Sequence, residues 1–305
     1  MNILNLGEAA KEPTAVALGI FDGMHRGHME VIGLAKRLAE EKGLSAAVFT
    51  FKIATVTSKG NSYKPIYTDD TKTRLLEEMG IDYLFMADFS QLRDYSGEDF
   101  ADKVLCNTFN SRLAVCGGDF RMGKNVSCSV RELSELAAER GIELHIADDV
   151  VDTTFGRISS AQIRQFIAAG NISDANRLLG RAYSVSGEVL HGNCLGRKMG
   201  FPTINQCMDD GIAMPKFGVY VSEAEIGGQV YRGVTNIGVK PTVENRNIPL
   251  AETHFPLFCG DLYGQSITVR LYEFLRSERK FEDAAALERQ IAADKSAAME
   301  YIITH

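Results

Sequence analysis

Two histidines near the start of the chain are the first residues whose spacing suggests chemistry. In the segment 19–28, GIFDGMHRGH, His25 and His28 are three residues apart, and glycines separate the bulkier side chains. The segment follows a strand-like run, Thr14–Ile20, and opens a helical pattern. A helix N-terminus presents unpaired amide groups to a phosphate, and imidazoles can donate hydrogen bonds as charge builds during transfer. The segment therefore predicts a nucleotide site, although a histidine at a helix start can also be a cap or a solvated side chain.

Two further segments of the same half have polar side chains where strands and helices should meet. Residues 117–123, GGDFRMG, come directly after the strand-like run Leu113–Cys116. Residues 157–164, RISSAQIR, open a helical pattern that ends at Gly170. Ligands of open parallel sheets lie beyond the carboxyl ends of the strands, so we expect all three segments to converge there. The simpler interpretation is that the serines cap the helix and that the last arginine pairs with a surface carboxylate.

Short apolar runs alternate with amphipathic helical patterns through the first 180 residues. The predicted strands are Thr14–Ile20, Ser45–Phe51, Tyr83–Met86, Leu113–Cys116 and Glu143–Ala147. The predicted helices are His28–Lys42, Asp69–Met79, a segment from Ser96 to about Phe109, one from a capping box at Ser129 to near Gly141, and Ala161–Ala169. Strands separated by helices imply right-handed crossovers and a parallel sheet covered on both faces. This half is therefore predicted to be a Rossmann-like α/β domain.

After Gly180 the periodicity changes to the alternation that is typical of strands. Val219–Ile226 and Gln229–Ile237 flank a Gly-Gly pair, a hairpin signal because both turn positions tolerate positive φ. Ile267–Phe274 is predicted to be a further strand. Several strands with no helix between them predict an antiparallel barrel or sandwich.

A helix is predicted to close the chain over Asp283–Ile303, with Leu287, Ile291 and Met299 as its apolar markers. The change of periodicity places the domain boundary between Arg181 and Ala182, which gives domains 1–181 and 182–305.

The composition excludes several classes of protein. With 45% hydrophobic and 24% charged residues, the chain suits two packed domains rather than global disorder. The formal charge of −7 argues against a dedicated nucleic-acid binder. No run approaches the roughly 20 apolar residues of a membrane span, and the start of the chain lacks the apolar core of a secretory signal. The cysteines are scattered without a C-x-x-C pair, which favours free thiols in a reducing cytosol over a zinc site. We therefore expect a cytoplasmic enzyme with neither a membrane nor a nucleic-acid partner, whose oligomeric state the sequence leaves open.

The first half resembles the nucleotidyltransferases, whose signature contains an H-x-G-H unit. With G-x-F-D-G in front of that unit, the segment 19–28 resembles the bacterial bifunctional riboflavin kinase/FAD synthetases. Residues 157–164 resemble the family's I-S-S-x-x-I-R element, and residues 117–123 resemble its G-x-D-F-x-F-G loop at the flavin and nucleotide site. The resemblance implies catalytic roles for His25 and His28, ATP binding by Gly19, Phe21, Asp22, Gly23, Gly27, Ser159, Ser160 and Arg164, and flavin binding by Asp119 and Phe120.

The reaction implied for this half is the attack of an FMN phosphate on the α-phosphorus of ATP, which yields FAD and pyrophosphate. An existing phosphate oxygen is already a nucleophile, so the reaction needs no serine or cysteine. Positioning and charge neutralisation by His25, His28, Arg164 and a Mg²⁺ ion would carry the catalysis.

The second half resembles the riboflavin kinases. Residues 196–205, GRKMGFPTIN, match the family's P-T-A-N motif and the glycines before it, with isoleucine in place of alanine. Without those additions, glycine spacing alone would indicate only a mobile loop. The resemblance implies that the glycines cradle the phosphates of ATP and that Thr203 and Asn205 hold Mg²⁺, an ion that prefers hard oxygen ligands. The ATP-binding residues implied in this half are Gly192, Gly196, Arg197, Gly200 and Pro202.

The same resemblance assigns the proton acceptor for the 5′-hydroxyl of riboflavin. Glu252 is implied as the general base, because an alcohol is a poor nucleophile until its proton has an acceptor. A lone glutamate is more commonly solvated on a strand, and His254 is the second candidate base. Arg276 is implied to lie near the flavin, whereas an arginine at such a position more often pairs with a surface carboxylate.

The first half departs from the family pattern at three places. Phe51 is followed by KIAT, residues 52–55, where the family has an acidic–Pro–His–Pro run. Met122 replaces an aromatic residue, and Ala161 replaces a threonine. Three alternatives therefore stay open beside the bifunctional enzyme: a riboflavin kinase with weakened or lost adenylyl transfer, a nucleotidyltransferase for another small phosphate, and a flavin-binding regulator.

Overall fold

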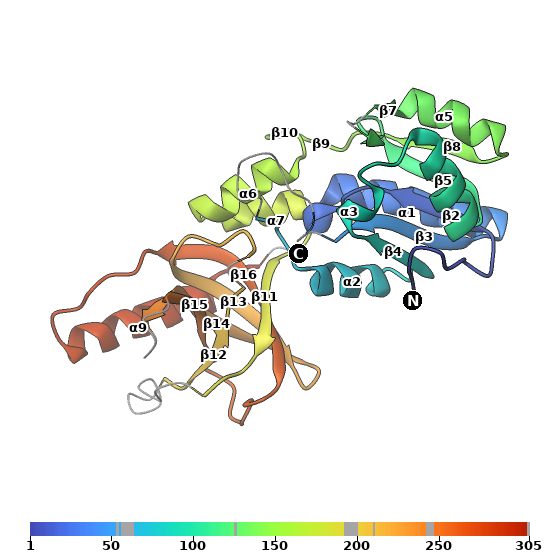
Figure 1. Cartoon of the computed structure of the whole chain (residues 1–305). Coiled ribbons are helices and arrows are strands. Elements are labelled where there is room, and N and C mark those ends of the chain that lie inside the picture. Colours follow the sequence, from blue (N-terminus) through green and yellow to red (C-terminus); the bar gives the residue numbers. More distant parts are fainter. Residues whose placement is uncertain are drawn as a thin grey trace. The chain divides into compact units, whose positions relative to one another are not determined.

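The computed structural model describes residues 1–52, 55, 64–124, 127–191, 201–209, 211–241 and 247–303. Contacts within the chain divide it into two compact units, Met1–Ser160 and Ala161–His305. Figure 1 shows a helix-covered sheet in the first unit and a curled sheet in the second.

A six-stranded parallel sheet forms the centre of the first unit. Its strand order is β1-β4-β3-β2-β5-β8, and every pairing is parallel. The strands are β1 Asn2–Leu4, β2 Thr14–Leu18, β3 Ser45–Phe51, β4 Tyr83–Ala87, β5 Ser111–Gly117 and β8 Glu143–Ala147. The predicted Rossmann-like α/β domain is confirmed. The short edge strand β1 was not predicted, because three residues are too few to show a periodicity.

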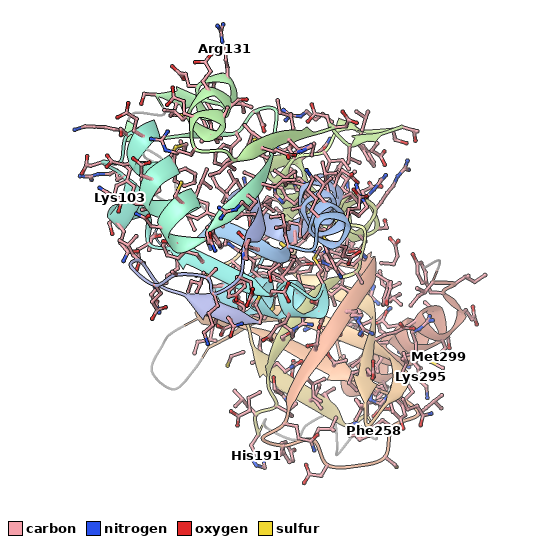
Figure 2. All side chains as sticks on the ribbon, turned by 90° about the vertical axis from the view of Figure 1, so that its right-hand side faces the viewer. Lys103, Arg131, His191, Phe258, Lys295 and Met299 are labelled. Atoms are coloured by element: carbon pink, nitrogen blue, oxygen red, sulfur yellow. The ribbon has the colours of Figure 1, made fainter. Side chains whose placement is uncertain are left out.

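Helices cover both faces of this sheet (Figure 1). They are η1 Asp22–Met24, α1 Arg26–Lys42, α2 Asp69–Glu78, α3 Phe89–Leu92, α4 Gly97–Asp99, the π-helical η3 Phe100–Thr108 and α5 Val130–Glu139. Two short hairpins complete the unit, β6 Arg121–Met122 with β7 Cys128–Ser129, and β9 Val151–Asp152 with β10 Gly156–Arg157. The outer faces are polar: Lys103 of η3 and Arg131 of α5 point away from the sheet (Figure 2).

Successive strand residues point to opposite faces and form two apolar cores. On one face, Ala17 of β2 belongs to the same core as Ile32 of α1. On the other face, Leu18 belongs to the same core as Phe100 of η3 and Leu133 of α5. Because both faces are buried, the strands are nearly continuous apolar runs.

Local signals set several of the helix ends, most of them where the sequence predicted. Gly43 ends α1 with a left-handed φ of 65°, and the capping box of Ser129 and Glu132 starts α5. A second capping box at Ser96 starts α4, but the helix that follows is π-helical rather than α-helical. The start of α1 at Arg26, two residues earlier than predicted, reflects capping by the side chain of His25.

The second unit is an antiparallel sheet of order β11-β16-β13-β14-β15-β12, preceded by two helices and followed by one. Its elements are α6 Ser160–Ala169, α7 Ile172–Leu179, β11 Tyr183–Glu188, β12 Thr203–Cys207, β13 Gly218–Ile226, β14 Gln229–Pro241, β15 Asn247–His254, β16 Ser266–Arg276 and α9 Ala284–Glu300. The predicted hairpin is confirmed, since β13 pairs with β14 through Gly227 and Gly228, both at positive φ.

The sheet curls until its two edge strands meet. Leu190, just after β11, forms an isolated bridge with Asn205 of β12. The amide of Gln206 donates to the carbonyl oxygens of Gly187 at 2.8 Å and Ile267 at 2.7 Å. These links join the two edges, and the predicted antiparallel, barrel-like domain is confirmed.

The closing helix α9 packs against β13 and β14. Asp283 caps its first turn, as the predicted start implied. Met299, predicted to mark the apolar face, is 39% exposed (Figure 2), whereas Asp294 and Ala298 are buried. The prediction for Met299 was wrong because a partly buried ion pair, between Asp294 and Arg276 at 2.7 Å, takes part of the inner face of the helix.

The division between the units differs from the predicted boundary at Arg181–Ala182. Contacts place α7 in the second unit because it packs against β11 and β16. The side chain of Asn176 on α7 donates to the carbonyl of Leu271 at 2.8 Å and accepts the N–H of Tyr183 at 2.7 Å. As a boundary between functional domains, Arg181–Ala182 stays a prediction.

Within the part of the chain that the structure describes, no helix is long and apolar enough to cross a membrane. The described cysteines are free thiols: Cys106, Cys116, Cys128, Cys207 and Cys259. Cys194 lies outside the described residues.

Candidate functional site

The first unit contains a cavity of about 720 Å³ at the carboxyl ends of its strands. The last residues of β2, β3, β5 and β8 all line it, which is where open parallel sheets bind ligands. The segments 19–28, 117–123 and 157–160 contribute to its wall. The lining residues that the sequence analysis singled out are Gly19, Phe21, His25, Gly27, His28, Asp119, Phe120, Met122, Ser159 and Ser160.

The loop between β2 and α1 has a strained backbone. Phe21 and Met24 have left-handed φ angles of 50° and 48°, and Gly23 between them has 77°. Each non-glycine residue in this region costs about 1–3 kcal/mol, so the conformation persists only because the surrounding structure imposes it. A Cβ on Gly19 would lie 2.6 Å from the ring of Phe21, and one on Gly23 would lie 2.6 Å from Ile66 Cδ1. A side chain at either position would therefore force its neighbour to shift.

Asp22 anchors this loop from beneath and is not among the residues that line the cavity. It is 2% exposed, and its Oδ1 accepts the N–H of Ile66 at 2.8 Å. The carbonyl oxygen of Asp22 accepts the hydroxyl of Ser160 at 2.9 Å. The structure thus gives Asp22 and Ser160 a role in shaping the loop, and their ATP contacts stay predictions.

His25 and His28 lie together at the start of α1. Their rings stack with centroids 3.5 Å apart, and His25 Nδ1 accepts the N–H of His28 at 3.3 Å. A nitrogen that accepts a hydrogen bond carries no proton, so the proton of the neutral His25 ring is on Nε2, which can donate. A Cβ on Gly27 would lie 3.3 Å from the His25 ring, so glycine leaves room for the stack. The simple interpretation of His25 as a cap is correct, and the same geometry also places its ring on the cavity wall.

Aromatic side chains that the sequence analysis did not assign form another wall of the cavity. Phe49 and Phe51 of β3 meet edge to face with centroids 5.2 Å apart, and Phe51 meets Phe89 of α3 at 5.5 Å. Phe49 also meets Phe100 of η3 at 5.1 Å. Such a wall suits a planar aromatic ligand. The sequence could have indicated this wall, because Phe51 lies at the carboxyl end of a predicted parallel strand, where ligands bind.

Charged groups lie at the cavity on the side of β5 and β8. Arg157 contacts Asp119 at 2.8 Å and Asp149 at 3.1 Å, so it connects the loops that follow these strands. The pKa of Arg157 is raised, first of all by its hydrogen bond to Asp119. The predicted flavin ligand Asp119 is therefore already paired with an arginine of the same wall.

In the second unit, the register of three strands gathers the polar residues expected in the kinase site. Asn205 of β12 pairs with Glu252 of β15, and Glu252 pairs with Asn236 of β14. Two residues along, Thr203 pairs with His254. Side chains of directly opposite antiparallel residues lie on one face, with Cβ atoms about 4.5–5.5 Å apart. Thr203 and Asn205 therefore share one face with Glu252, which lies about 50 residues later in the sequence.

His254 fixes the segment that leads into this face. Its Nδ1 donates to the carbonyl of Pro202 at 2.8 Å, and its ring meets Phe201 edge to face at 5.6 Å. Burial lowers the pKa of His254, which is 8% exposed. The neutral ring thus orients Pro202 and Thr203, a structural role that the sequence analysis did not consider.

The oxygen donors on this face fit a magnesium ion. Thr203 supplies a hydroxyl and Asn205 an amide oxygen, both hard ligands of the kind Mg²⁺ prefers. Beside them, the amide of Asn236 donates to Glu278 Oε1 at 3.1 Å, and a Cβ on Gly238 would lie 2.2 Å from that oxygen. Within the described residues, no cluster of three or more His, Cys, Asp or Glu side chains could hold a metal.

The remaining predicted residues are placed as follows. Arg276 makes a bidentate pair with Asp294 of α9, so it is a salt-bridge partner, but that carboxylate is buried rather than on the surface as the simpler interpretation had it. Arg164 lies on α6 in the second unit. Several predicted residues lie outside the part of the chain that the structure describes: Gly192, Gly196, Arg197 and Gly200. The same is true of Ile53 and Ala54, in the segment 52–55 that departs from the family pattern.

Two family models match the chain, FAD synthetase over residues 7–162 and riboflavin kinase over residues 179–302. A curated bifunctional riboflavin kinase/FMN adenylyltransferase of Bacillus subtilis (strain 168) is 36% identical over 295 residues, covering 94% of this chain and 92% of its own. The protein of the same name from Escherichia coli (strain K12) is 31% identical over 303 residues, covering 98% and 96%.

A solved structure, described as a macrolide-efflux protein from Streptococcus pneumoniae, is 29% identical, with a TM-score of 0.85 over 97% of this chain and 96% of that one. Its fold matches both units. The word efflux describes that protein and not this chain. The matches of both family models, together with relatives above 30% identity over nearly the whole length, show that the chain belongs to the bifunctional riboflavin kinase/FMN adenylyltransferase family.

Proposed function

We propose that the chain converts riboflavin to FMN with its second unit and FMN to FAD with its first, using ATP in both steps. The observation that carries this proposal is the strand register in the second unit, which puts Thr203, Asn205 and Glu252 on one face. A protein that only transferred adenylyl groups would have no use for that arrangement.

In the first unit, we propose that ATP and FMN share the 720 Å³ cavity. A phosphate oxygen of FMN attacks the α-phosphorus of ATP; a new P–O bond forms, and the bond to the β-phosphate breaks to release pyrophosphate. The Nε2–H of His25 and the ring of His28 donate hydrogen bonds to the phosphates, and Ser159 and Ser160 complete their binding. ATP binding by Arg164, on α6, stays a prediction. Such donors stabilise the charge that develops in the transition state.

The flavin ring is proposed to pack on the aromatic wall formed by Phe49, Phe51 and Phe89. Asp119 and Phe120, which line the same cavity, would orient its polar edge. The departures from the family pattern do not remove this wall, because the aromatic rings come from other positions.

In the second unit, the 5′-oxygen of riboflavin attacks the γ-phosphorus of ATP, and ADP leaves. Glu252 accepts the proton of that hydroxyl group during the attack. Asn205 and Asn236 lie directly opposite Glu252 on the two neighbouring strands. Thr203 and Asn205 would hold Mg²⁺, which supplies charge neutralisation at the transferring phosphoryl group. Gly192, Gly196, Arg197, Gly200 and Pro202 are proposed to bind the ATP phosphates, and Arg276 to lie beside the flavin.

We also propose that the enzyme works in the cytoplasm without a nucleic-acid partner. Free thiols suit a reducing compartment, and a net charge of −7 does not favour polyanions. The functional domains are proposed to meet at Arg181–Ala182.

The deciding experiment is incubation of the chain with riboflavin, ATP and Mg²⁺, followed by chromatography over time. We expect FMN first, then FAD, each in amounts well above one per protein. FMN without FAD would favour a riboflavin kinase that has lost adenylyl transfer. Adenylylation of nicotinate or pantetheine phosphates instead of FMN would favour another nucleotidyltransferase, and flavin binding without turnover would favour a regulator.

A further inference from the structure

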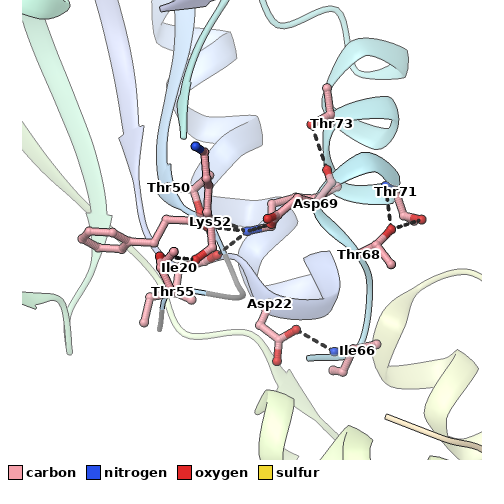
Figure 3. Close-up of polar contacts among 12 residues, drawn as sticks. Ile20, Asp22, Thr50, Lys52, Thr55, Ile66, Thr68, Asp69, Thr71 and Thr73 are labelled. Atoms are coloured by element: carbon pink, nitrogen blue, oxygen red, sulfur yellow. Dashed lines mark hydrogen bonds and ion pairs between the residues drawn. The ribbon is translucent and has the colours of Figure 1, made fainter. Parts of the chain in front are cut away.

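A lysine is completely buried beneath the cavity of the first unit. Lys72 lies on α2, and its side chain is 0% exposed. Its Nζ donates to the carbonyl oxygens of Phe51 at 3.0 Å and Ile20 at 3.3 Å, and it lies 3.4 Å from Thr50 Oγ1. Figure 3 shows Ile20, Thr50 and Asp69 in this region. Phe51 and Ile20 both line the cavity. The ammonium group therefore joins the end of β3 to the loop that follows β2.

The surroundings of Lys72 do not favour its charge. Burial lowers its pKa to about 8, although the carboxylates of Asp69 and Asp22 act to raise it. Asp69 is on the same helix, with Oδ1 3.8 Å from Nζ, and Asp22 is in the β2–α1 loop. One turn after Lys72, the same face of α2 buries Leu76, as an amphipathic helix normally does. A charged side chain buried at a position suited to an apolar residue does not favour stability, which indicates that Lys72 has a functional role.

That task is suggested by the carbonyl group of Ile20. This oxygen accepts both Lys72 Nζ and, at 2.7 Å, the hydroxyl of Thr50. With two donors on one carbonyl, the orientation of the peptide group that leads into Phe21 is fixed. Phe21 is the first left-handed residue of the strained loop, whose shape must be imposed by its surroundings. The loop ends at His25, which caps α1.

We propose that Lys72 is a positioning residue for adenylyl transfer: its ammonium group holds the β2–α1 loop against the end of β3 and so aims His25 and His28 into the cavity. The proposal rests on the adenylyltransferase function proposed above. Lys72 is not among the residues that line the cavity, so it acts through the loop rather than on a substrate.

The first test is Lys72→Met, which keeps the length of the side chain but removes the charge and the donors. We expect kcat for FAD formation from FMN to fall about 10–100-fold, because a small misplacement of catalytic groups has effects of that size. KM for FMN and ATP should change much less. The thermal stability of the first unit should stay equal or rise, because the variant no longer buries a charge.

A matched control is Lys36→Met in the same unit. Lys36 on α1 also donates to a backbone carbonyl, that of Met79 at 2.8 Å, but it is 38% exposed and does not line the cavity. This variant should form FAD at the wild-type rate. Riboflavin phosphorylation by the second unit, measured in the same samples, should not change in either variant.

The pH dependence of kcat for FAD formation distinguishes a positioning role from a purely structural one, because a purely structural lysine would not change it. As pH rises through about 8, Lys72 loses its charge and one of its three N–H donors, which weakens its hold on the three acceptors, so wild-type kcat for FAD formation should fall relative to Lys72→Met. The unfolded chain keeps the ordinary pKa of 10.5 and binds more protons between about 8 and 10.5, so wild-type stability should rise with pH in that window. The methionine variant should show neither trend.

Two results would overturn the proposal. One is a Lys72→Met variant that forms FAD within about twofold of the wild-type rate. The other is a loss of FAD formation that is accompanied by a matching loss of thermal stability or of riboflavin phosphorylation. A wild-type chain that forms no FAD from FMN would contradict the proposed function itself, before any variant is compared.

Discussion

The two units support their candidate ATP sites in different ways. In the first unit, His25 follows a strained loop, and contacts from Ile66, Lys72 and Ser160 hold that loop in place. In the second unit, Asn205 and Glu252 lie on neighbouring antiparallel strands whose backbone pairing sets their distance.

Because of this difference, we expect different kinds of substitution to impair the two activities. A site on a strained loop depends on side chains that touch no substrate, because they impose the backbone conformation. A site on paired strands depends mainly on its own residues, since the hydrogen-bonded ladder fixes their register. Substitutions outside the first site should therefore affect FAD formation more than equivalent substitutions affect FMN formation.

The largest effect should come from Glu252→Gln. Riboflavin phosphorylation should fall about 10²–10⁴-fold, because an amide cannot accept the hydroxyl proton. FAD formation from added FMN should stay unchanged, and both products can be separated by chromatography. Glu225→Gln, an exposed glutamate on β13, is the control and should phosphorylate riboflavin normally. A Glu252→Gln variant with near-normal phosphorylation would remove Glu252 from the role of base.

The reciprocal change is His28→Ala in the first unit. FAD formation from FMN should fall about 10²–10³-fold, the usual effect of losing one donor to developing charge. Riboflavin phosphorylation should be unaffected. His145→Ala changes a half-exposed histidine of the same unit that does not line the cavity, and it should behave as wild type. If His28→Ala abolished both activities in a folded protein, the two sites would not be independent.

A smaller and more specific effect is expected for Thr203→Val, which replaces a hydroxyl by a methyl group of similar size. The Mg²⁺ concentration for half-maximal riboflavin phosphorylation should rise roughly tenfold or more, the scale of effects for disturbed metal sites. A Mg²⁺ titration of both activities in one sample measures this. An equal shift in the Mg²⁺ requirement of FAD formation would show that Thr203 does not act on a metal of the second unit.

The smallest effect is a change of stability from Gly23→Ala. A Cβ at φ 77° and 2.6 Å from Ile66 should destabilise the first unit by about 1–3 kcal/mol. FAD formation should then be lost at a lower temperature than in wild type, whereas loss of riboflavin phosphorylation should keep its temperature. Gly43→Ala is the control, with φ 65° but no atom within 4 Å of the added Cβ, and should have the smaller effect. Equal effects would show that the contact with Ile66 is unimportant.

Much of the fold followed from local patterns. The buried parallel strands, the hairpin at Gly227–Gly228 and the caps at Gly43 and Ser129 depend on neighbouring residues, and the structure bears them out. Strand β15, which holds Glu252, was not predicted, because its residues show no clear alternation. The role of Lys72 was also missed, since a lysine on a helix is normally solvated.

What the sequence by itself determined is therefore the order of elements and the motifs of both halves, because propensity, capping and periodicity act over a few residues. Tertiary structure alone decided that Asn205 lies beside Glu252, that Phe51 and Phe89 form one wall, and that Lys72 lies beneath the loop before His25. Each of these contacts joins segments that are distant along the chain, and only sheet register and packing bring such segments together.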